Sequence, residues 1–599
     1  MCGIVGYTGR GQAAPRLLAG LSRLAYRGYD SAGLALCGEE GLFTLRAEGK
    51  LEALCSRVGD PTTLPQSVGI AHTRWATHGA PTEQNAHPHT AFAGDVAVVH
   101  NGIIENHRAL RAELECRGIC FSSDTDTEVV PHLLSLALAA HHDPLAAILE
   151  VTRRLEGAYA LAILFRAYPH QIWAVRKQSP LAVAVGEDGC YLASDMPALA
   201  GLCSSVMFPA EGDIVCLTPT GLSLFDREGA PVTRPSHPVP ATAQEVEKGE
   251  WSTFMEKELC EAPLGVARTT DALLRKDLPS LRLGAVRELC FLGCGSAWHV
   301  GVLGKYLFEE HLGLPVQVEP ASEMRYRRVP LSAHALGVAI SQSGETADTL
   351  AAARKLKELG LPLLGIVNVD GSALTRESDA LLPTLAGPEL AVATTKAYCA
   401  QVAALLVLLA KTAQAKGEEA LAKEVRTALS TLPREMEETL ALAPEIQAHA
   451  TELASATHAF YLGRGTDYAA VMEGALKLKE ISYIHAQAYP AGELKHGTIS
   501  LVEEGTPVVA CLTQPRLTGK TLSGVEEVRS RGARPLLLVT GETEVSPQTG
   551  KVLRLPSSSP LTAPLLGALA MARLALDTCL TRGTDPDRPR NLAKSVTVE

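Results

Sequence analysis

The segment FLGCGSAWHVG (291–301) returns in altered form as YLGRGTDYAAV (461–471). In both segments an apolar strand-like run ends at Gly-x-Gly, beginning with Gly293 in one and Gly463 in the other, and a Ser or Thr then opens a helical pattern. A second pair of segments, which begin at 339 and 510, repeats at a similar offset when Ser341 is matched to Thr513. Self-similarity at a nearly constant spacing predicts two related domains in tandem.

Buried apolar strands alternate with long helical patterns throughout this half of the chain. The predicted strands include ELCFLG (288–293), ALGVAIS (335–341), PLLGIV (362–367), AFYLG (459–463), PVVACL (507–512) and PLLLV (535–539). Continuous apolar runs separated by helices are typical of a parallel sheet in an α/β domain. The half before it has shorter strands broken by Gly, Pro and Asn, which indicates an α+β domain. We therefore expect an α+β domain at 2–230, a Pro-rich linker at 231–250, α/β domains at 251–430 and 431–588, and a tail at 589–599.

Composition excludes several classes of protein. The 599 residues carry a formal net charge of −11, with basic residues scattered, so a nucleic-acid partner is not expected. The N-terminus lacks the pattern of a signal peptide, and the apolar run at 400–410 is too short to span a bilayer. No pair among the 14 cysteines has CxxC spacing, which argues against disulfides and thiolate zinc sites. We expect a cytoplasmic protein.

The stretch SQSGETADT (341–349) follows a buried strand and leads into a helix. That geometry aims backbone N–H groups at an anion, and Ser341, Gln342, Ser343 and Thr346 add polar side chains. Since the lysine of a nucleotide-binding GxxxxGK[ST] loop is absent, a small phosphate ester fits better than a nucleoside triphosphate. The alternative is an ordinary helix cap made by Ser343 or Thr346.

A charged stripe in MEGALKLKEISYI (472–484) comprises Glu473, Lys477 and Glu480, which share one helical face. Apolar residues border the stripe on both sides, which favours a cleft over a solvated surface. Displaced pKa values in a cleft would suit acid–base chemistry. His496, in a Gly-bounded loop, and Lys594, in the apolar tail, carry little weight on their own.

Four histidines occur in HTRWATHGAPTEQNAHPH (72–89), without a carboxylate or cysteine at ligand spacing, so a metal site is only weakly indicated. Arg74 and His78 instead suggest a polar pocket for a zwitterion. Asn101-Gly102 could supply an amide and a backbone N–H to an oxyanion. The alternative for Asn-Gly is a β-turn.

Cys2 directly follows the initiator methionine. Removal of Met1 would leave Cys2 with a free α-amine of pKa ~7.7 to 8, so that nucleophile and base belong to one residue. The alternative is an inert thiol on an edge strand.

Together these motifs closely resemble the glutamine:fructose-6-phosphate aminotransferases, also called glucosamine-6-phosphate synthases. The resemblance rests on MCGIVGY, YRGYDSAG, HTRWATHG, HNGIIEN and DTDTE, followed by SQSGETADT, TTKAY, EGALKLKEISYIHA, GELKHG and PRNLAKSVTVE, in that order along nearly the whole chain. It implies an N-terminal-nucleophile glutaminase sandwich followed by two sugar isomerase domains.

The resemblance also implies roles for individual residues. Cys2 would attack the side-chain amide of glutamine, while Asn101 and Gly102 hold the oxyanion. Glutamine would be bound by Arg74, Thr77, His78, His87 and Asp126. The sugar phosphate would be bound by Ser296, Ser341, Gln342, Ser343, Thr346, Val392 and Ala593.

For the sugar chemistry the resemblance implies a Schiff base on Lys594, proton transfer by Glu480, charge balance by Lys477 and ring opening by His496. Trp75 would gate an ammonia channel. No cofactor or metal is required. The substrates would be glutamine and fructose 6-phosphate, and a homodimer through the second half is expected, with no nucleic-acid or membrane partner.

Some positions depart from the family pattern. Ala297 stands where a serine is expected, Thr498 replaces a proline, and Pro490 replaces an alanine. Ala297 leaves open another ketose or a sugar-amine as acceptor. A non-catalytic sugar-phosphate sensor is disfavoured because it would need none of Cys2, Glu480, His496 and Lys594. A phosphoribosyl amidotransferase should show an acidic pyrophosphate-binding motif, which is absent.

Overall fold

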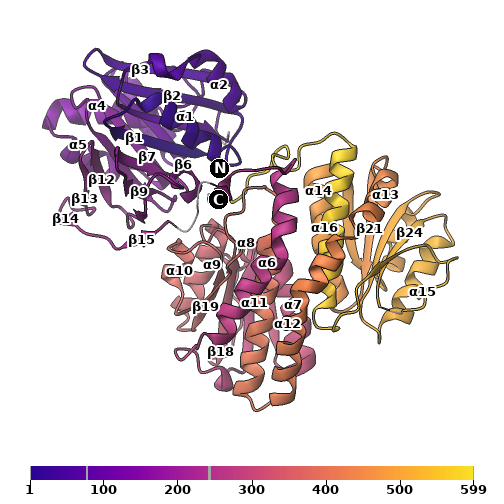
Figure 1. Cartoon of the computed structure of the whole chain (residues 1–599). Helices are drawn as coiled ribbons and strands as arrows, with labels where there is room; N and C mark the ends of the chain where they lie inside the picture. Colours follow the sequence, from indigo (N-terminus) through magenta and orange to yellow (C-terminus); the bar gives the residue numbers. More distant parts are fainter. Residues whose placement is uncertain (1, 76–77, 240–243, 542, 598–599) are drawn as a thin grey trace. The chain divides into compact units, whose positions relative to one another are not determined.

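The structure is a computed structural model that describes residues 2–75, 78–239, 244–541 and 543–597. The chain divides into two compact units (Figure 1). The first comprises Met1–Glu247 and Ala593–Glu599, and the second comprises Lys248–Leu592.

The first unit contains two antiparallel sheets that pack face to face. An eight-stranded sheet has the order β15-β11-β9-β10-β1-β4-β2-β3, and a seven-stranded sheet has the order β14-β13-β12-β8-β7-β6-β5. The strands of the larger sheet are β1 (Gly3–Gly9), β2 (Ser31–Gly38), β3 (Gly41–Glu48), β4 (Val68–Arg74), β9 (Ala182–Val185), β10 (Gly189–Ala193), β11 (Ser205–Met207) and β15 (Ser236–Pro238). Those of the smaller sheet are β5 (His89–Thr90), β6 (Val96–Ile104), β7 (Gly157–Phe165), β8 (Ile172–Lys177), β12 (Ile214–Thr218), β13 (Gly221–Phe225) and β14 (Pro231–Val232).

Helices cover the outer faces of this sandwich. α1 (Ala13–Arg23) packs on β1 and β4, and α2 (Leu51–Val58) packs on β3. α3 (His107–Cys116), α4 (Val129–His141) and α5 (Pro144–Arg154) share a core with the smaller sheet. Alternate strand residues point into the core between the sheets and into the cores under the helices, so nearly every position of β1, β4 and β7 is buried. The expected glutaminase-type sandwich is confirmed.

The second unit contains two five-stranded parallel sheets, confirming the predicted pair of α/β domains. Their orders, β17-β16-β18-β19-β20 and β22-β21-β23-β24-β25, are the same when each domain is numbered from its own first strand. The strands are β16 (Glu288–Gly293), β17 (Val316–Pro320), β18 (Ala335–Ser341), β19 (Leu363–Val367), β20 (Ala380–Pro383), β21 (His458–Gly463), β22 (His485–Pro490), β23 (Pro507–Leu512), β24 (Arg534–Thr540) and β25 (Lys551–Leu555).

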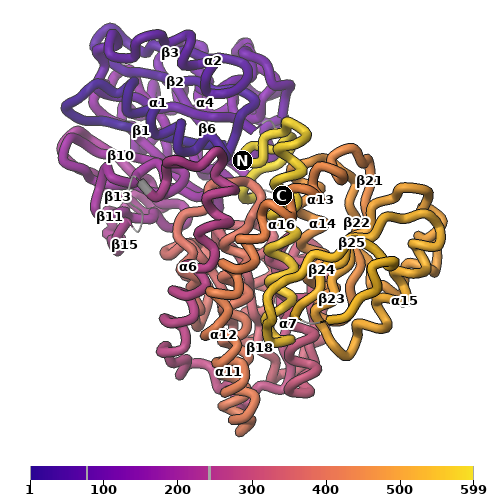
Figure 2. The backbone as a smooth tube through the Cα atoms, turned by 45° about the vertical axis from the view of Figure 1, so that its right-hand side comes forward, coloured from indigo at the N-terminus to yellow at the C-terminus, as the bar shows by residue number. Residues whose placement is uncertain are grey.

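Helices flank and join these sheets. They are α6 (Phe254–Arg275), α7 (Ser296–Leu312), α8 (Ala321–Met324), α9 (Ala347–Glu358), α10 (Ala373–Glu377), α11 (Lys396–Ala415), α12 (Glu419–Leu440), α13 (Ala443–Leu453), α14 (Thr466–Ser482), α15 (Thr518–Arg529) and α16 (Ala563–Thr581). α7 of the first domain packs on α14 of the second, and α14 lies beside α16 (Figures 1 and 2). This packing makes the two repeats one body.

The structure shifts the alignment of the two repeats by a single position. The equivalent strands β18 and β23 end at Ser341 and Leu512, and the helices that follow them begin at Ala347 and Thr518. Ser341 therefore corresponds to Leu512, and the match of Ser341 with Thr513 inferred from sequence is wrong. Matching two hydroxyl residues caused the error, because Thr513 lies just beyond the end of its strand.

The segment 231–250, expected as a linker, also contributes to the fold. Pro231–Val232 pairs with β13, and Ser236–Pro238 pairs with β11, so both stretches belong to sheets of the first unit. The division between the units falls after Glu247.

α11 and α16 are long and apolar enough to cross a membrane by length and composition, but 89% of each apolar window is buried inside the structure. The run at 400–410, which suggested a shorter segment, is the centre of the 20-residue helix α11. Both helices pack in the shared core of the second unit, which is the environment of a core helix.

Gly474 permits the close approach of α14 to α16, because a Cβ there would lie 2.6 Å from the sulfur of Met571. We expect Gly474→Ala to destabilise the second unit by about 1–3 kcal/mol through overpacking. Gly519 of α15 has nothing within 4 Å of its ideal Cβ, so Gly519→Ala should be neutral or stabilising by up to ~1 kcal/mol. Scanning calorimetry of both variants tests this, and equal unfolding temperatures would contradict it.

Candidate active sites

Cys2 immediately precedes β1 and lies close to the end of β4. Its Sγ is 3.2 Å from the backbone N of Trp75, which donates to it, and 3.6 Å from the Trp75 carbonyl. The antiparallel pairing of Gly3 with Thr73 produces this proximity. Burial raises the pKa of the Cys2 thiol, so the nucleophile would need a base to deprotonate it.

Asn101 and Gly102 lie in β6 and belong to the strand rather than to a β-turn. The Asn101 side chain donates its Nδ2 to the carbonyl of Cys2 at 2.9 Å. Gly102 has φ +137°, and a Cβ there would lie 2.0 Å from the Ala158 carbonyl oxygen, so only glycine fits. The structure therefore brings the Asn101 amide to the backbone of Cys2.

Four buried histidines lie behind Asn101. The Nε2 of His72 is 2.9 Å from the His100 carbonyl, 3.2 Å from Asn101 Oδ1 and 3.2 Å from the Nδ1 of His87. Burial lowers the pKa of His72 and of His89 to about 3, and it also lowers the pKa of His87 and His100. The rings are therefore neutral at pH 7, and a neutral His72 can donate to the Asn101 amide.

The residues predicted to bind glutamine have different surroundings. Arg74 is buried at the end of β4, and its guanidinium donates to the carbonyls of His78, Gly79 and Ala80. Asp126 is buried, and its Oδ2 accepts the N–H of Ile104 at 2.8 Å. His78 is half-buried, whereas Thr77 lies outside the described residues.

The SQSGET stretch forms the predicted loop between β18 and α9. Thr346 is the N-cap residue of α9, but its hydroxyl makes no capping hydrogen bond to the helix. Ser341 Oγ accepts the N–H of Gly344 at 2.9 Å, and Ser343 Oγ accepts the N–H of Glu345 at 3.2 Å. The Thr346 hydroxyl instead lies 3.4 Å from Ser341 Oγ, so capping does not account for it. The loop stands at the carboxyl end of the sheet, where open α/β sheets bind ligands.

The charged stripe of α14 is largely buried, and α14 packs on α7. Lys477 Nζ lies 3.4 Å from Glu473 Oε1 and 2.6 Å from Glu480 Oε2. Glu473 accepts from Ser296 Oγ at 2.8 Å and lies 2.8 Å from His299 Nδ1. Glu480 remains partly exposed, at 19% of its side chain. It is therefore the member of the stripe that can reach a ligand.

The electrostatics of this cluster follow from burial. Burial opposes the charge of Lys477, but Glu480 and Glu473 together raise the pKa of its ammonium above the usual value. Burial alone would raise the pKa of Glu473, but Lys477 and His299 hold it below the usual value. The lysine and Glu473 are therefore both charged. His299, which the sequence analysis missed, follows Ser296 by nearly one helical turn, and that spacing on α7 was the available signal.

The remaining predicted residues lie in loops and in the tail. His496 is exposed in a short 3-10 turn (Leu494–His496). Val392 is buried, and its N–H donates to the Asp587 carbonyl at 3.3 Å. Asp587 also accepts the N–H groups of Phe254 and Met255 at the start of α6, both at 2.9 Å. The chain is thus fixed to the second unit just before the tail, while Ala593 and the half-buried Lys594 group with the first unit.

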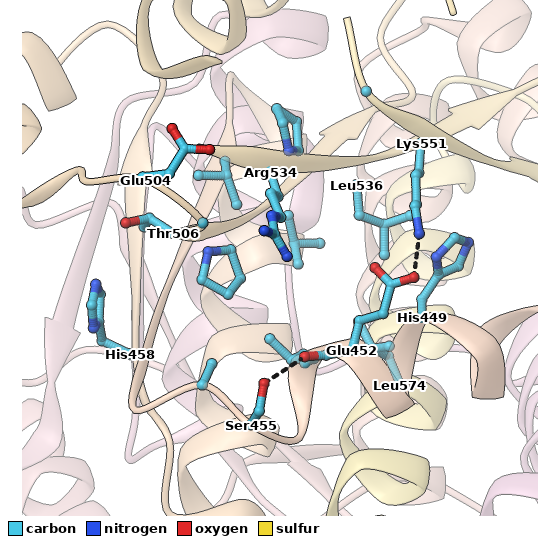
Figure 3. Close-up of a pocket in the computed structure, with 18 of the residues that line it drawn as sticks. His449, Glu452, Ser455, His458, Glu504, Thr506, Arg534, Leu536, Lys551 and Leu574 are labelled. Carbon is cyan, nitrogen blue, oxygen red and sulfur yellow. Dashed lines mark hydrogen bonds and ion pairs between the residues drawn. The ribbon is translucent and has the colours of Figure 1, made fainter. Parts of the chain in front are cut away.

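A separate cavity of about 550 Å³ lies at the amino ends of β21, β23, β24 and β25 (Figure 3). Arg534 and Lys551 reach into it, and Lys551 pairs with Glu452. No predicted site residue lines it. Within the described part of the chain, no group of three or more His, Cys, Asp or Glu side chains is placed to hold a metal ion.

Comparisons with known proteins cover the whole chain. A glutamine amidotransferase domain model matches residues 72–201, and a SIS domain model matches 284–411 and 452–571. The chain is 45% identical, over 100% of both sequences, to the glutamine–fructose-6-phosphate aminotransferases (isomerizing) of Symbiobacterium thermophilum and Brucella suis. The C-terminal domain of glucosamine-fructose-6-phosphate aminotransferase from Francisella tularensis matches with a TM-score of 0.55 and 35% identity, over 57% of this chain and 100% of that one.

Replacing Lys477 by methionine should reverse the way in which the contribution of Glu473 to folding stability changes with pH. With Lys477 present, the folded state lowers the pKa of Glu473, so the ion pair stabilises the protein above the unfolded pKa of ~4.3 and loses this effect as pH falls. In Lys477→Met, burial would raise the pKa of Glu473, so the folded state would lose stability as pH rises. The cost should reach about 3–5 kcal/mol near pH 8.

The measurement is the unfolding temperature of both proteins between pH 4.5 and 8. We expect the unfolding temperature of Lys477→Met to fall further below that of the parent as the pH rises. Lys479→Met is the matched control, because Lys479 is close to Lys477 on the same helix and is half-buried. A deficit that is constant across this range, or equal in the two variants, would contradict the assignment.

Proposed function

The chain belongs to the family of isomerizing glutamine–fructose-6-phosphate aminotransferases, and on that premise we propose how its residues divide the reaction. The enzyme hydrolyses glutamine and transfers the ammonia to fructose 6-phosphate with ketose–aldose isomerisation, giving glucosamine 6-phosphate and glutamate. The first unit performs the glutaminase step, and the second binds and isomerises the sugar.

In the first unit, Cys2 is the nucleophile, and its α-amine, freed by removal of Met1, takes the thiol proton. The thiolate attacks the glutamine side-chain amide, and the oxyanion is held by Asn101 Nδ2 and the Gly102 N–H. Collapse expels ammonia and leaves a thioester, which water hydrolyses to glutamate. The contact of Asn101 with Cys2 at 2.9 Å supports this arrangement.

Glutamine recognition is assigned to charged groups beside Cys2. Arg74 binds the α-carboxylate and Asp126 binds the α-amine, and Thr77 and His78 are also assigned to glutamine binding. Because Arg74 already donates to the carbonyls of 78–80, that loop fixes the guanidinium. His87 contacts His72 rather than open space, so we assign it to positioning Asn101 through His72.

In the second unit, Ser341, Gln342, Ser343 and Thr346 hold the phosphate, joined by Ser296, Val392 and Ala593 at the sugar. His496 opens the sugar ring. The Lys594 amine then forms a Schiff base with the C2 carbonyl and releases water, and ammonia adds at C2 and displaces the lysine amine to leave an imine at C2. Glu480 carries a proton between C1 and C2, and Lys477 balances its charge. The ion pair of Glu480 with a buried lysine is the observation that carries this assignment.

Ammonia must reach the sugar unprotonated, since ammonium is not a nucleophile. We assign Trp75 to the gate of an internal channel and the tail to closing the sites against water. The contact of the Trp75 N–H with the Cys2 sulfur supports a position next to the released ammonia. We further propose a cytoplasmic homodimer, formed through the second half, that uses no cofactor and binds neither nucleic acid nor membranes.

Cys2→Ala should abolish glutamine hydrolysis, because the thioester is assigned to Cys2, and should leave isomerisation of the sugar phosphate. Glutamate release and conversion of fructose 6-phosphate to glucose 6-phosphate measure the two activities. Cys55→Ala, at a half-buried cysteine of the same unit, is the matched control. Loss of both activities in Cys2→Ala would mean that the cysteine is structural.

Borohydride trapping should locate the Schiff base. After incubation with fructose 6-phosphate and reduction, we expect one sugar adduct per chain, on Lys594, by peptide mass spectrometry. Lys594→Arg should give no adduct, and Lys479→Met should give the same adduct as the parent. An adduct on another lysine, or none with any ketose phosphate while glutamine is still hydrolysed, would overturn this mechanism.

A further inference from the structure

The second α/β domain holds a buried carboxylate at its strand-to-helix turn. Asp467 is 1% exposed, and its Oδ2 accepts the backbone N–H of Thr513 at 2.9 Å. Its Oδ1 accepts the Thr513 hydroxyl and lies 3.6 Å from Cys511 Sγ. Burial raises the pKa of Asp467 to about 6. No step of the proposed reaction uses this group.

Asp467 and Ala297 occupy equivalent positions in the two repeats. Each is the second residue of a 17-residue helix whose N-cap is a glycine with positive φ, 56° at Gly295 and 59° at Gly465. The N–H of Ala297 donates to the Cys294 carbonyl at 3.2 Å, and the N–H of Asp467 donates to the Arg464 carbonyl at the same distance. Ala297 and Asp467 therefore have the same position relative to the strand-to-helix turn of their own domain.

The neighbouring strands, β18 in the first domain and β23 in the second, also end at equivalent positions. Leu292 pairs with Ala339 in one sheet, and Leu462 pairs with Ala510 at the corresponding place in the other. Gln342 and Thr513 are thus the equivalent first residues beyond the strand. The N–H of Thr513 donates to Asp467, whereas the N–H of Gln342 makes no hydrogen bond to any described residue.

We propose that the Asp467 carboxylate occupies, in the second domain, the position that the phosphate of fructose 6-phosphate takes in the first. The side chain at the second helical position then decides which domain binds the sugar phosphate. Backbone N–H groups and hydroxyls at such a turn bind carboxylate and phosphate alike. This inference rests on the proposed function, which places the phosphate at the SQSGET loop.

The inference gives Ala297 a physical role. A methyl group has no charge or acceptor, so the Gln342 N–H stays open to an incoming anion. A carboxylate there would take that donor and repel the phosphate. Ser296, the preceding residue, already donates to Glu473 of the charged stripe. The open anion position, at Ala297 in the first α/β domain, is therefore one residue from a side chain that contacts the charged stripe, whereas the closed position is at Asp467 in the second α/β domain.

Ala297→Asp tests the first half of the inference. We expect the KM for fructose 6-phosphate in glucosamine 6-phosphate formation to rise by at least ~100-fold, as expected for two like charges brought together. The unfolding temperature of the second unit, compared with that of the parent, reports on folding. Ala297→Asn has the same shape without the charge, and we expect a rise of less than about tenfold. Equal effects of Asp and Asn, or no effect of Asp, would overturn the inference.

Asp467→Ala tests the second half. Equilibrium dialysis with labelled inorganic phosphate should find one site per chain in the parent, two in Asp467→Ala and none in Ala297→Asp. Asp467→Asn keeps an acceptor for Thr513 without the charge, and it should keep one site. An Asp467→Ala protein that unfolds at the parent's temperature and still binds one phosphate would show that Asp467 is only a structural clamp.

The proposed function and this inference can fail separately. Phosphate binding that follows these variants, without amination of fructose 6-phosphate, would reject the proposed function and retain the inference. Amination of fructose 6-phosphate with a KM for that sugar that is unchanged by Ala297→Asp would retain the proposed function and reject the inference.

Discussion

The ammonium of Lys477, held between the carboxylates of Glu473 and Glu480, is the interaction on which the second unit depends. The side chain is 1% exposed, so its charge is tolerated only while both partners remain in place. Glu473 in turn requires Ser296 and His299 from α7, which belongs to the other repeat. The packing of α7 on α14 therefore sets both the stability of the cluster and the position of Glu480. The carboxylate assigned to proton transfer is thus held by the interface between two duplicated domains.

The two repeats differ in which polar residues they carry at equivalent positions. The residues of α7 that correspond to Glu473 and Lys477 are Leu303 and Leu307, both buried and apolar. Conversely, the loop that follows β23 has lost the SGET turn that follows β18. The SQSGET loop assigned to the phosphate belongs to one copy, and the Glu473, Lys477 and Glu480 stripe, whose Glu480 is assigned to proton transfer, belongs to the other. The packing of α7 on α14 joins the two copies in one unit.

The sequence predicted the central strands of the second unit closely, because strands buried on both faces are continuous apolar runs. β16, β18 and β23 match ELCFLG, ALGVAIS and PVVACL residue for residue. The edge strands β17, β20, β22 and β25 are short and half-polar, and they were missed. The stripe on α14 followed from helical spacing, but its partner His299 did not, because periodicity reports one element and this contact joins two helices far apart in the chain.

In the first unit, too, the sequence revealed a candidate residue but not the distant residue that orients it. The Asn101 amide could be found from the Asn-Gly pair, but its orientation depends on His72, which reaches it from β4 across the two packed sheets. Burial keeps His72 neutral, so it donates to the Asn101 oxygen only with its single ring proton on Nε2, and burial is a property of the whole sandwich. Cys2 directly precedes β1, and Asn101 and His72 lie in β6 and β4; no local pattern encodes the order of these three strands. In both units, therefore, local sequence supplies the reactive group, and long-range packing fixes its charge and direction.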